Sequence, residues 1–302
     1  MIERRVGLLG ATSLTGECLM RCMIRHHWQI TAFSRQSVST SQPHHPQISW
    51  QQLKQNNCCS RKTNNVPYWI CVAPLWILPD YFDFLIAQGA QRIVALSSTS
   101  RFTKNTSSDP NEKEIAQKLT QSEALLQTWA STHAIEYIVL RPTLIYGYGR
   151  DKNIAEIAKF IRRFGFFPLL GAAGGLRQPI HVEDVVFACL SALSTLNLKN
   201  RSYNLAGGEI LSYRNMVKRI FEKLDRKVCM PAIPIRIFQL AVSGINWLPR
   251  YRHLTLAMAE RMNQNLQFDY SDAQRDLHFH PRPFDLAIED LSSENEENHR
   301  LI

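Results

Sequence analysis

The residues best suited to chemistry lie near the start of the chain, in the segment GLLGATSLTGE at residues 7–17. Gly10, Ser13 and Gly16 have the spacing of a dinucleotide-binding turn, whose three small residues make a tight turn, admit the pyrophosphate and let helix pack on strand. Serine adds bulk at the second position, but its hydroxyl can bond a phosphate oxygen, and a helix N-terminus favours an anion. The alternative is a glycine-rich turn without a ligand. We assign to the phosphates Gly10, Thr12, Ser13, Leu14, Thr15 and Gly16.

The second expected strand ends in AFSRQS, residues 32–37, and this tip bears on the choice of cofactor. Sheets that bind NAD place an acid here for the ribose hydroxyls, whereas this tip carries Ser34 and Arg35 and no nearby acid. Arginine suits a phosphate because its donors are planar and permanently charged. The tip therefore favours NADP over NAD, against the alternative of an ordinary exposed arginine after a strand.

Short apolar strands alternate with amphipathic helices through the first half of the chain, and these elements must position the loop and the strand tip. Such alternation predicts a parallel sheet with helices on both faces. The expected strands cover residues 4–9, 29–35, 48–53, 66–74, 91–100 and 136–149. The expected helices cover residues 17–28, 78–90 and 111–131.

After Gly149 the alternation loosens and helical spacing dominates. The expected helices cover residues 153–165, 182–196, 212–224, 233–249 and 253–266, with a strand-like segment at 202–208. We therefore predict an α/β fold: a Rossmann-type, doubly wound parallel sheet with a smaller, mostly helical C-terminal substrate lobe. The predicted division is a dinucleotide-binding domain at 1–150, with part of the lobe interleaved later, a substrate lobe at 151–290 and an acidic tail at 291–302.

Composition narrows the classes of function. The chain has 302 residues and a net charge of +9, and its end, from residue 285, holds six acids and one arginine, so the basic charge lies before it. The basic residues are scattered and form no nucleic-acid-binding module, so we expect an anionic small-molecule ligand and no nucleic acid. The start does not resemble a secretory signal, and no uninterrupted apolar run is long enough for a membrane span.

Seven cysteines in a chain without a signal peptide favour reduced thiols and a cytoplasmic protein. Cys18, Cys22 and His26 fall at i, i+4 and i+8, so they can share one helix face and suggest a metal site. No fourth ligand of suitable spacing follows nearby. We therefore expect a buried helix face here and no metal.

Five segments occur in a recognisable order: GATSLTG, LSSTS, RPTLIYGYG, QPIHVEDVV and YNLAGGE. Together they resemble the extended or atypical short-chain dehydrogenase/reductases, the NAD-dependent epimerase/dehydratase family. The resemblance implies that Ala73 and Pro74 flank the adenosine and that residues 97–99 lie beside the nicotinamide. It also implies that His181, Glu183 and Asp184 begin a helix of the second lobe. The cofactor contacts implied beyond the glycine loop and the strand tip are Ala73, Pro74, Ser97, Arg141, Pro142, Thr143 and Leu144.

The chain departs from this family at the group that moves the proton. Family members usually act through a Tyr and a Lys four residues later on the helix after the hydroxyl strand, where the Lys lowers the pKa of the phenol. No tyrosine occurs between Tyr81 and Tyr137. Ser98 and Thr99 are the remaining candidates to polarise a carbonyl, with Lys104 next, against the alternative of a solvated lysine. Candidates for contacting a substrate diphosphate are Asn153, Arg177, Gln178 and Arg250, each of which also fits a surface or loop position.

Three functions stay open at this point. The first is an NADP-dependent enzyme that moves hydride on a nucleotide sugar or another carbonyl compound with a non-standard proton donor. The second is a protein that binds the cofactor without catalysis, similar to the nucleotide-binding accessory subunit of respiratory complex I. The third is a membrane-surface or assembly protein that docks through its basic body and residues 233–248. Substrate identity and a homodimer are not decided by the sequence.

Overall fold

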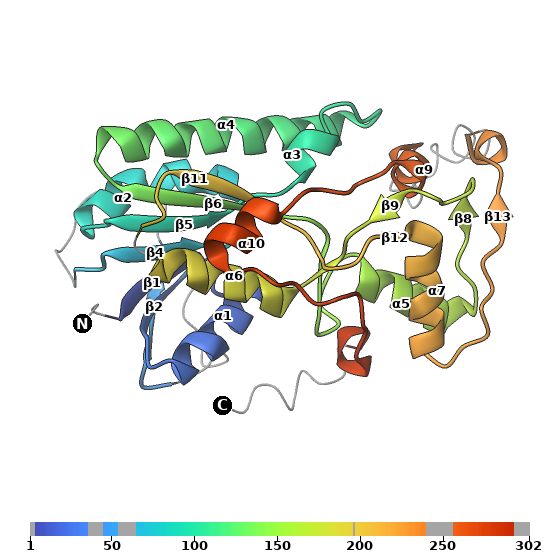
Figure 1. Ribbon diagram of the computed structural model, residues 1–302, viewed down its shortest axis with the longest axis horizontal. Helices are drawn as coiled ribbons and strands as arrows, with labels where there is room; N and C mark the ends of the chain where they lie inside the picture. The colour runs from blue at the N-terminus through green and yellow to red at the C-terminus, as the bar shows by residue number, and fades with distance from the viewer. Residues whose placement is uncertain (1–3, 36–44, 54–64, 196, 240–255, 293–302) are drawn as a thin grey trace.

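Seven parallel strands form one sheet in the order β11-β6-β5-β4-β1-β2-β3 (Figure 1). The computed structural model describes residues 4–35, 45–53, 65–195, 197–239 and 256–292. The strands are β1 (Arg5–Leu9), β2 (Gln29–Ser34), β3 (Ile48–Gln52), β4 (Tyr68–Cys71), β5 (Arg92–Leu96), β6 (Glu136–Pro142) and β11 (Arg201–Leu205). Because β1 lies between β2 and β4, strand order reverses there, which is where doubly wound sheets bind ligands. The predicted Rossmann-type α/β fold is confirmed.

Helices cover both faces of this sheet (Figure 1). One face carries α1 (Leu14–Arg25), α6 (Val182–Ser194) and α10 (Ser271–Leu277), whose apolar side chains share a core with the sheet. The other face carries η1 (Leu75–Tyr81), α2 (Phe82–Ala87) and α4 (Pro110–Thr132). All five residues of β5 are buried, as expected for a parallel strand covered on both sides. The short helix α3 (Ser100–Thr103) follows β5.

A second lobe packs around its own apolar core at one end of the molecule (Figure 1). Its helices are α5 (Ile154–Phe164), α7 (Tyr213–Lys223) and α9 (Leu256–Asn263), with η3 (Ile288–Asp290) near the end of the chain. Two-residue strands form three pairs: β7 (Ile145–Tyr146) with β10 (Ile180–His181), β8 (Leu169–Leu170) with β13 (Ala232–Ile233), and β9 (Leu176–Arg177) with β12 (Leu211–Ser212). Within the described ranges, no helix is both long and apolar enough to cross a membrane.

The position of α6 differs from the expectation that it belongs to the second lobe. It packs against α1 and the sheet, with Val185, Ala188 and Cys189 buried. The reason is topological: β11 lies parallel to β6, and a parallel connection must cross one face of the sheet, usually through a helix. The chain therefore leaves the sheet after β6 to build part of the lobe and returns through α6.

Candidate cofactor site

Two glycines allow the loop between β1 and α1 to fold tightly against β4. Gly10 has a φ of +88°, and a Cβ there would lie 2.5 Å from the backbone nitrogen of Ala73. A Cβ on Gly16 would lie 2.3 Å from the carbonyl oxygen of Gly10. Both positions therefore require glycine, one for its backbone conformation and both for the close approach of main chains.

The Ser13 hydroxyl holds the loop together. It donates to the carbonyl oxygen of Gly10 at 2.8 Å and accepts from the Gly16 amide at 3.1 Å, so Ser13 is the N-cap of α1. The sequence suggested a bond from this hydroxyl to a phosphate, but its proton is already used within the loop. The amides of Leu14 and Thr15 have no acceptor among the residues described, and free amides at a helix N-terminus attract an anion.

A cavity of about 190 Å³ lies beside this loop, at the carboxyl ends of β1, β2 and β4. The structure brings together around it seven of the residues that the sequence assigned to the cofactor: Gly10, Thr12, Ser13, Ser34, Arg35, Ala73 and Pro74. Six further residues complete the lining, and the sequence did not single them out: Leu9, Phe33, Leu53, Val72, Ile77 and Tyr81. They are mostly apolar, which suits the faces of a nucleobase.

Arg35 follows β2 directly and lies at the mouth of this cavity with an exposed side chain. No carboxylate in the described part of the chain forms an ion pair with it. The cavity thus has apolar walls and, beside them, helix amides and a guanidinium for which the described residues supply no partner.

A buried carboxylate organises the carboxyl ends of β5 and β6. Glu123 on α4 is only 1% exposed, and it accepts a hydrogen bond from Ser97 Oγ at 2.5 Å. Its oxygens also bind Arg141, with a closest N–O distance of 2.6 Å, and the guanidinium of Arg101. Ser97 and Arg141 were assigned to the cofactor from the sequence, and here both are held by Glu123.

The three residues proposed for catalysis differ in what they contact. Ser98 Oγ accepts from the Ser100 amide at 3.1 Å, and its own proton has no acceptor among the described residues. Thr99 Oγ1 donates to the carbonyl oxygen of Pro142 at 3.2 Å, so it is tied to β6. Lys104 Nζ lies 3.4 Å from Glu112 Oε1 at the start of α4. Burial, and after it repulsion from Arg261, lowers the pKa of Lys104.

The face of α4 between its two buried acids carries no proton-transfer pair. Glu112, Ile115, Leu119 and Glu123 follow at intervals of three and four residues, so they share this face. Ile115 and Leu119 have the i, i+4 spacing of a Tyr–Lys pair, but both are apolar and pack into the core between α4 and the sheet. Where the family usually has its Tyr–Lys pair, this chain therefore presents an apolar surface of α4.

Two of the four residues predicted to bind substrate, Arg177 and Gln178, hold the second lobe together. Arg177 is 4% exposed and donates to the carbonyl oxygens of Leu176 and Gln264, each at 2.7 Å, and to that of Arg261. Burial lowers the pKa of Arg177 to about 10. Gln178 Oε1 accepts from the Phe268 amide at 2.7 Å.

The remaining predicted residues beyond β6 are divided between the chain's framework and its surface. Thr143 Oγ1 donates to the carbonyl oxygen of Gln178 at 2.5 Å, while Pro142 is buried and Leu144 packs against the second core. Asn153 is exposed at the start of α5, and Arg250 lies outside the described residues. Of the four substrate candidates, Asn153 alone has an exposed side chain among those described.

Comparison with known proteins agrees with this architecture. Residues 81–206, from the end of η1 to just past β11, match the model of the NAD dependent epimerase/dehydratase family, which confirms the resemblance seen in the sequence. An uncharacterized protein y4nG of Sinorhizobium fredii is 24% identical over 213 residues, 66% of this chain and 52% of that protein. A UDP-glucose 4-epimerase of Vibrio cholerae is 22% identical over 164 residues, 51% and 50% of the two chains. The chain thus spans about half the length of these relatives.

Solved structures share the fold over nearly the whole chain. The UDP-glucose 4-epimerase of Thermotoga maritima, solved with UDP-glucose, has a TM-score of 0.66 at 15% identity and covers 98% of both chains. MoeE5 in complex with UDP-glucose and NAD has a TM-score of 0.68 at 17% identity, with 98% and 99% covered. At identities this low, the structural match establishes the shared fold alone, so the function of the site depends on the residues of this chain.

Proposed function

We propose that this chain binds a nicotinamide dinucleotide at the carboxyl edge of its sheet, with NADP preferred to NAD, and transfers hydride between it and a carbonyl compound. The cavity that joins the glycine loop, the tip of β2 and the segment after β4 carries this proposal. The free amides of Leu14 and Thr15 support a diphosphate at the start of α1. The guanidinium of Arg35, which no carboxylate among the described residues pairs with, supports a phosphate on the adenosine ribose.

The nicotinamide end would extend along the sheet edge from β4 towards β5 and β6, which follow in that order. The bound cofactor supplies or accepts the hydride. Ser98 stands at the end of β5 with a proton that no described residue accepts, so it is the residue we assign to polarise a substrate carbonyl. Thr99 holds the loop against β6 through Pro142.

A nucleotide sugar is the first substrate class to test. Two of the structures with the same fold were solved with UDP-glucose, and one relative is a UDP-glucose 4-epimerase. The second lobe, which rises beside the carboxyl edge of the sheet, is where the substrate would be selected (Figure 1). A division into a cofactor domain and a substrate lobe, a cytoplasmic location and a homodimer stay predictions.

A second candidate function is cofactor binding without catalysis, and α4 favours it. Ile115 and Leu119 place hydrocarbon where the family's proton-transfer pair has the same spacing. Ser97 and Arg141 are held by Glu123, which leaves Ser98 as the hydroxyl with an unassigned proton at the end of β5 among the described residues.

Single-turnover kinetics separates the two candidates. The protein with bound NADP is mixed with a panel of UDP-sugars, and with bound NADPH it is mixed with keto-sugars, while the absorbance of reduced nicotinamide is recorded. The enzyme proposal predicts slow turnover that Ser98→Ala lowers about a hundredfold without weakening NADPH binding. Ser131→Ala, at the exposed far end of α4, is the matched control and should change nothing. Tight NADPH binding without any turnover would instead support the non-catalytic candidate.

A further inference from the structure

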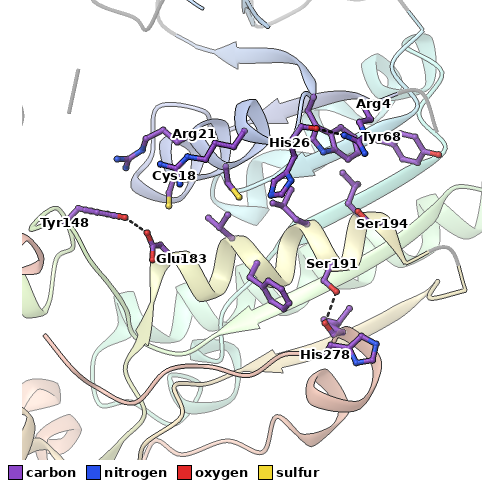
Figure 2. Close-up of a pocket in the computed structure, with 18 residues that line it drawn as sticks. Arg4, Cys18, Arg21, His26, Tyr68, Tyr148, Glu183, Ser191, Ser194 and His278 are labelled. Atoms are coloured by element: carbon purple, nitrogen blue, oxygen red, sulfur yellow. Dashed lines mark hydrogen bonds between the residues drawn. The ribbon is translucent and has the colours of Figure 1, made fainter. Parts of the chain in front are cut away.

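A second cavity, of about 1040 Å³, lies between α1 and α6 on one face of the sheet (Figure 2). Its lining shares no residue with that of the cofactor cavity. The two helices run side by side, and Figure 2 shows side chains from both of them turned into the space between. On α6 the lining runs from Glu183 to Ser194, a span of about 16 Å at about 1.5 Å per residue, so the cavity is an elongated groove.

The walls of this groove are largely apolar. On α6 the lining residues Val186, Phe187, Leu190 and Leu193 form one stripe at helical spacing, and Phe187 is 49% exposed. On α1 the thiols of Cys18 and Cys22 face the groove; burial raises the pKa of Cys18 to about 11 and also raises that of Cys22. Burial therefore favours the uncharged form of both thiols, which behaves as a small apolar group.

Three arginines line the groove. Arg4, Arg21 and Arg25 line it, and in the described part of the chain no carboxylate forms an ion pair with any of them. The one acid in the lining, Glu183, is already engaged by the Tyr148 hydroxyl at 2.5 Å and by Arg282 at 3.0 Å. An apolar groove with excess positive charge selects for an amphipathic anion.

The two ends of the groove differ in polarity (Figure 2). At one end Tyr148 and Glu183 bind each other, and the Arg21 guanidinium lies over the Tyr148 ring at 4.9 Å from its centroid, so the polar groups there already have partners. At the other end Arg4 donates to the carbonyl oxygen of His26 at 2.6 Å, and His26 and Ser194 turn towards the same space. Arg25 lines the groove in the last turn of α1, one residue before His26. The anionic head therefore belongs at the end formed by Arg4, Arg25 and His26.

We propose that this groove is a second ligand site, which takes a long-chain carboxylate: the head group on Arg4 and Arg25, and the hydrocarbon along Phe187 and Leu190. Its volume matches the upper end of the range of about 300–1,000 Å³ that pockets for small molecules occupy, which supports a small-molecule ligand. A partner protein would instead need an interface burying roughly 1,200 Å² or more. This site shares no lining residue with the cofactor cavity and does not rest on the proposed function.

Calorimetric titration with palmitate, kept below its micelle concentration, tests the proposal. Palmitate should bind, and hexadecanol, which has the same chain without the charge, should bind at least about tenfold more weakly. Phe187→Glu should abolish palmitate binding, and Arg25→Gln should weaken it about ten- to a hundredfold. Phe164→Glu and Arg163→Gln, both exposed on α5, are the matched controls and should leave binding unchanged.

Three results would overturn the proposal. If palmitate does not bind, the groove is not a site for a long-chain carboxylate. If hexadecanol binds as tightly as palmitate, the arginines do not bind the head group. Binding to phosphatidylglycerol vesicles without binding to free palmitate would assign the groove to a bilayer surface instead. NADPH affinity and the melting temperature of each variant, measured in parallel, show that the variant is folded, since both altered side chains are exposed and lie outside the cofactor cavity.

Discussion

Replacing Glu123 by glutamine should lower the stability of the protein by about 3 kcal/mol, because it leaves two guanidiniums beside a neutral group. This is the lower end of the range for breaking a buried ion pair, since Arg101 and Arg141 keep 19% and 14% of their side chains exposed. An unfolding entropy of about 2.1 cal/mol/K per residue gives roughly 0.6 kcal/mol/K for 302 residues. The melting temperature should therefore fall by about 5 °C.

Thermal unfolding followed by circular dichroism measures this change. Glu114→Gln on the same helix is the matched control, because Glu114 pairs with Lys118 on the exposed surface and should cost under about 0.5 kcal/mol, or about 1 °C. Arg101→Gln should have an intermediate effect, since Arg141 still satisfies the carboxylate. If Glu123→Gln melts within about 1 °C of the unchanged protein, the buried cluster does not hold the ends of β5, β6 and α4 together.

Three further substitutions test the remaining roles. Gly10→Ala puts a Cβ 2.5 Å from the Ala73 nitrogen, so the affinity for NADPH, measured by titration, should fall at least about a hundredfold. An unchanged affinity would show that this loop does not bind the cofactor. Ser13→Ala removes the N-cap of α1 and should lower the melting temperature by about 2 °C, while the affinity for NADPH should stay within about threefold. A far larger loss of affinity would show that the Ser13 hydroxyl binds a phosphate of the cofactor. Arg177→Met should lower the melting temperature by about 5 °C because three carbonyls lose their donor; a variant that melts normally would refute its structural role.

The sheet and the cofactor loop could be predicted because local sequence determines them. Except for β3, each strand from β1 to β6 is a short apolar or β-favouring run. The turn after β1 needs Gly10 and Gly16 for backbone reasons, and their spacing is visible in the sequence. Arg35 could be placed at the sheet edge because it follows a strand directly. The predicted end of a strand is therefore enough to bring these residues to one edge.

The uses of individual side chains could not be predicted, because they depend on contacts between distant segments. Glu123 lies in a polar stretch of α4 that looks solvent-exposed, and only the packed helix brings it to Ser97 and Arg141. Arg177 has the sequence context of a phosphate ligand, yet its partners are main-chain carbonyls, two of them more than eighty positions away. Leu53 follows a weakly patterned strand, and nothing in that segment marks it as a wall of the cavity.

Equilibrium titration of NADPH and NADH tests the central claim most directly. A charge-assisted bond from Arg35 to the ribose phosphate contributes about 1.5 to 3 kcal/mol, so NADPH should bind roughly ten- to a hundredfold more tightly than NADH. Arg35→Ala should remove most of that difference while leaving NADH affinity unchanged. Failure of both cofactors to bind, or tighter binding of NADH, would contradict the proposal that the cavity beside Gly10 and Arg35 is an NADP site.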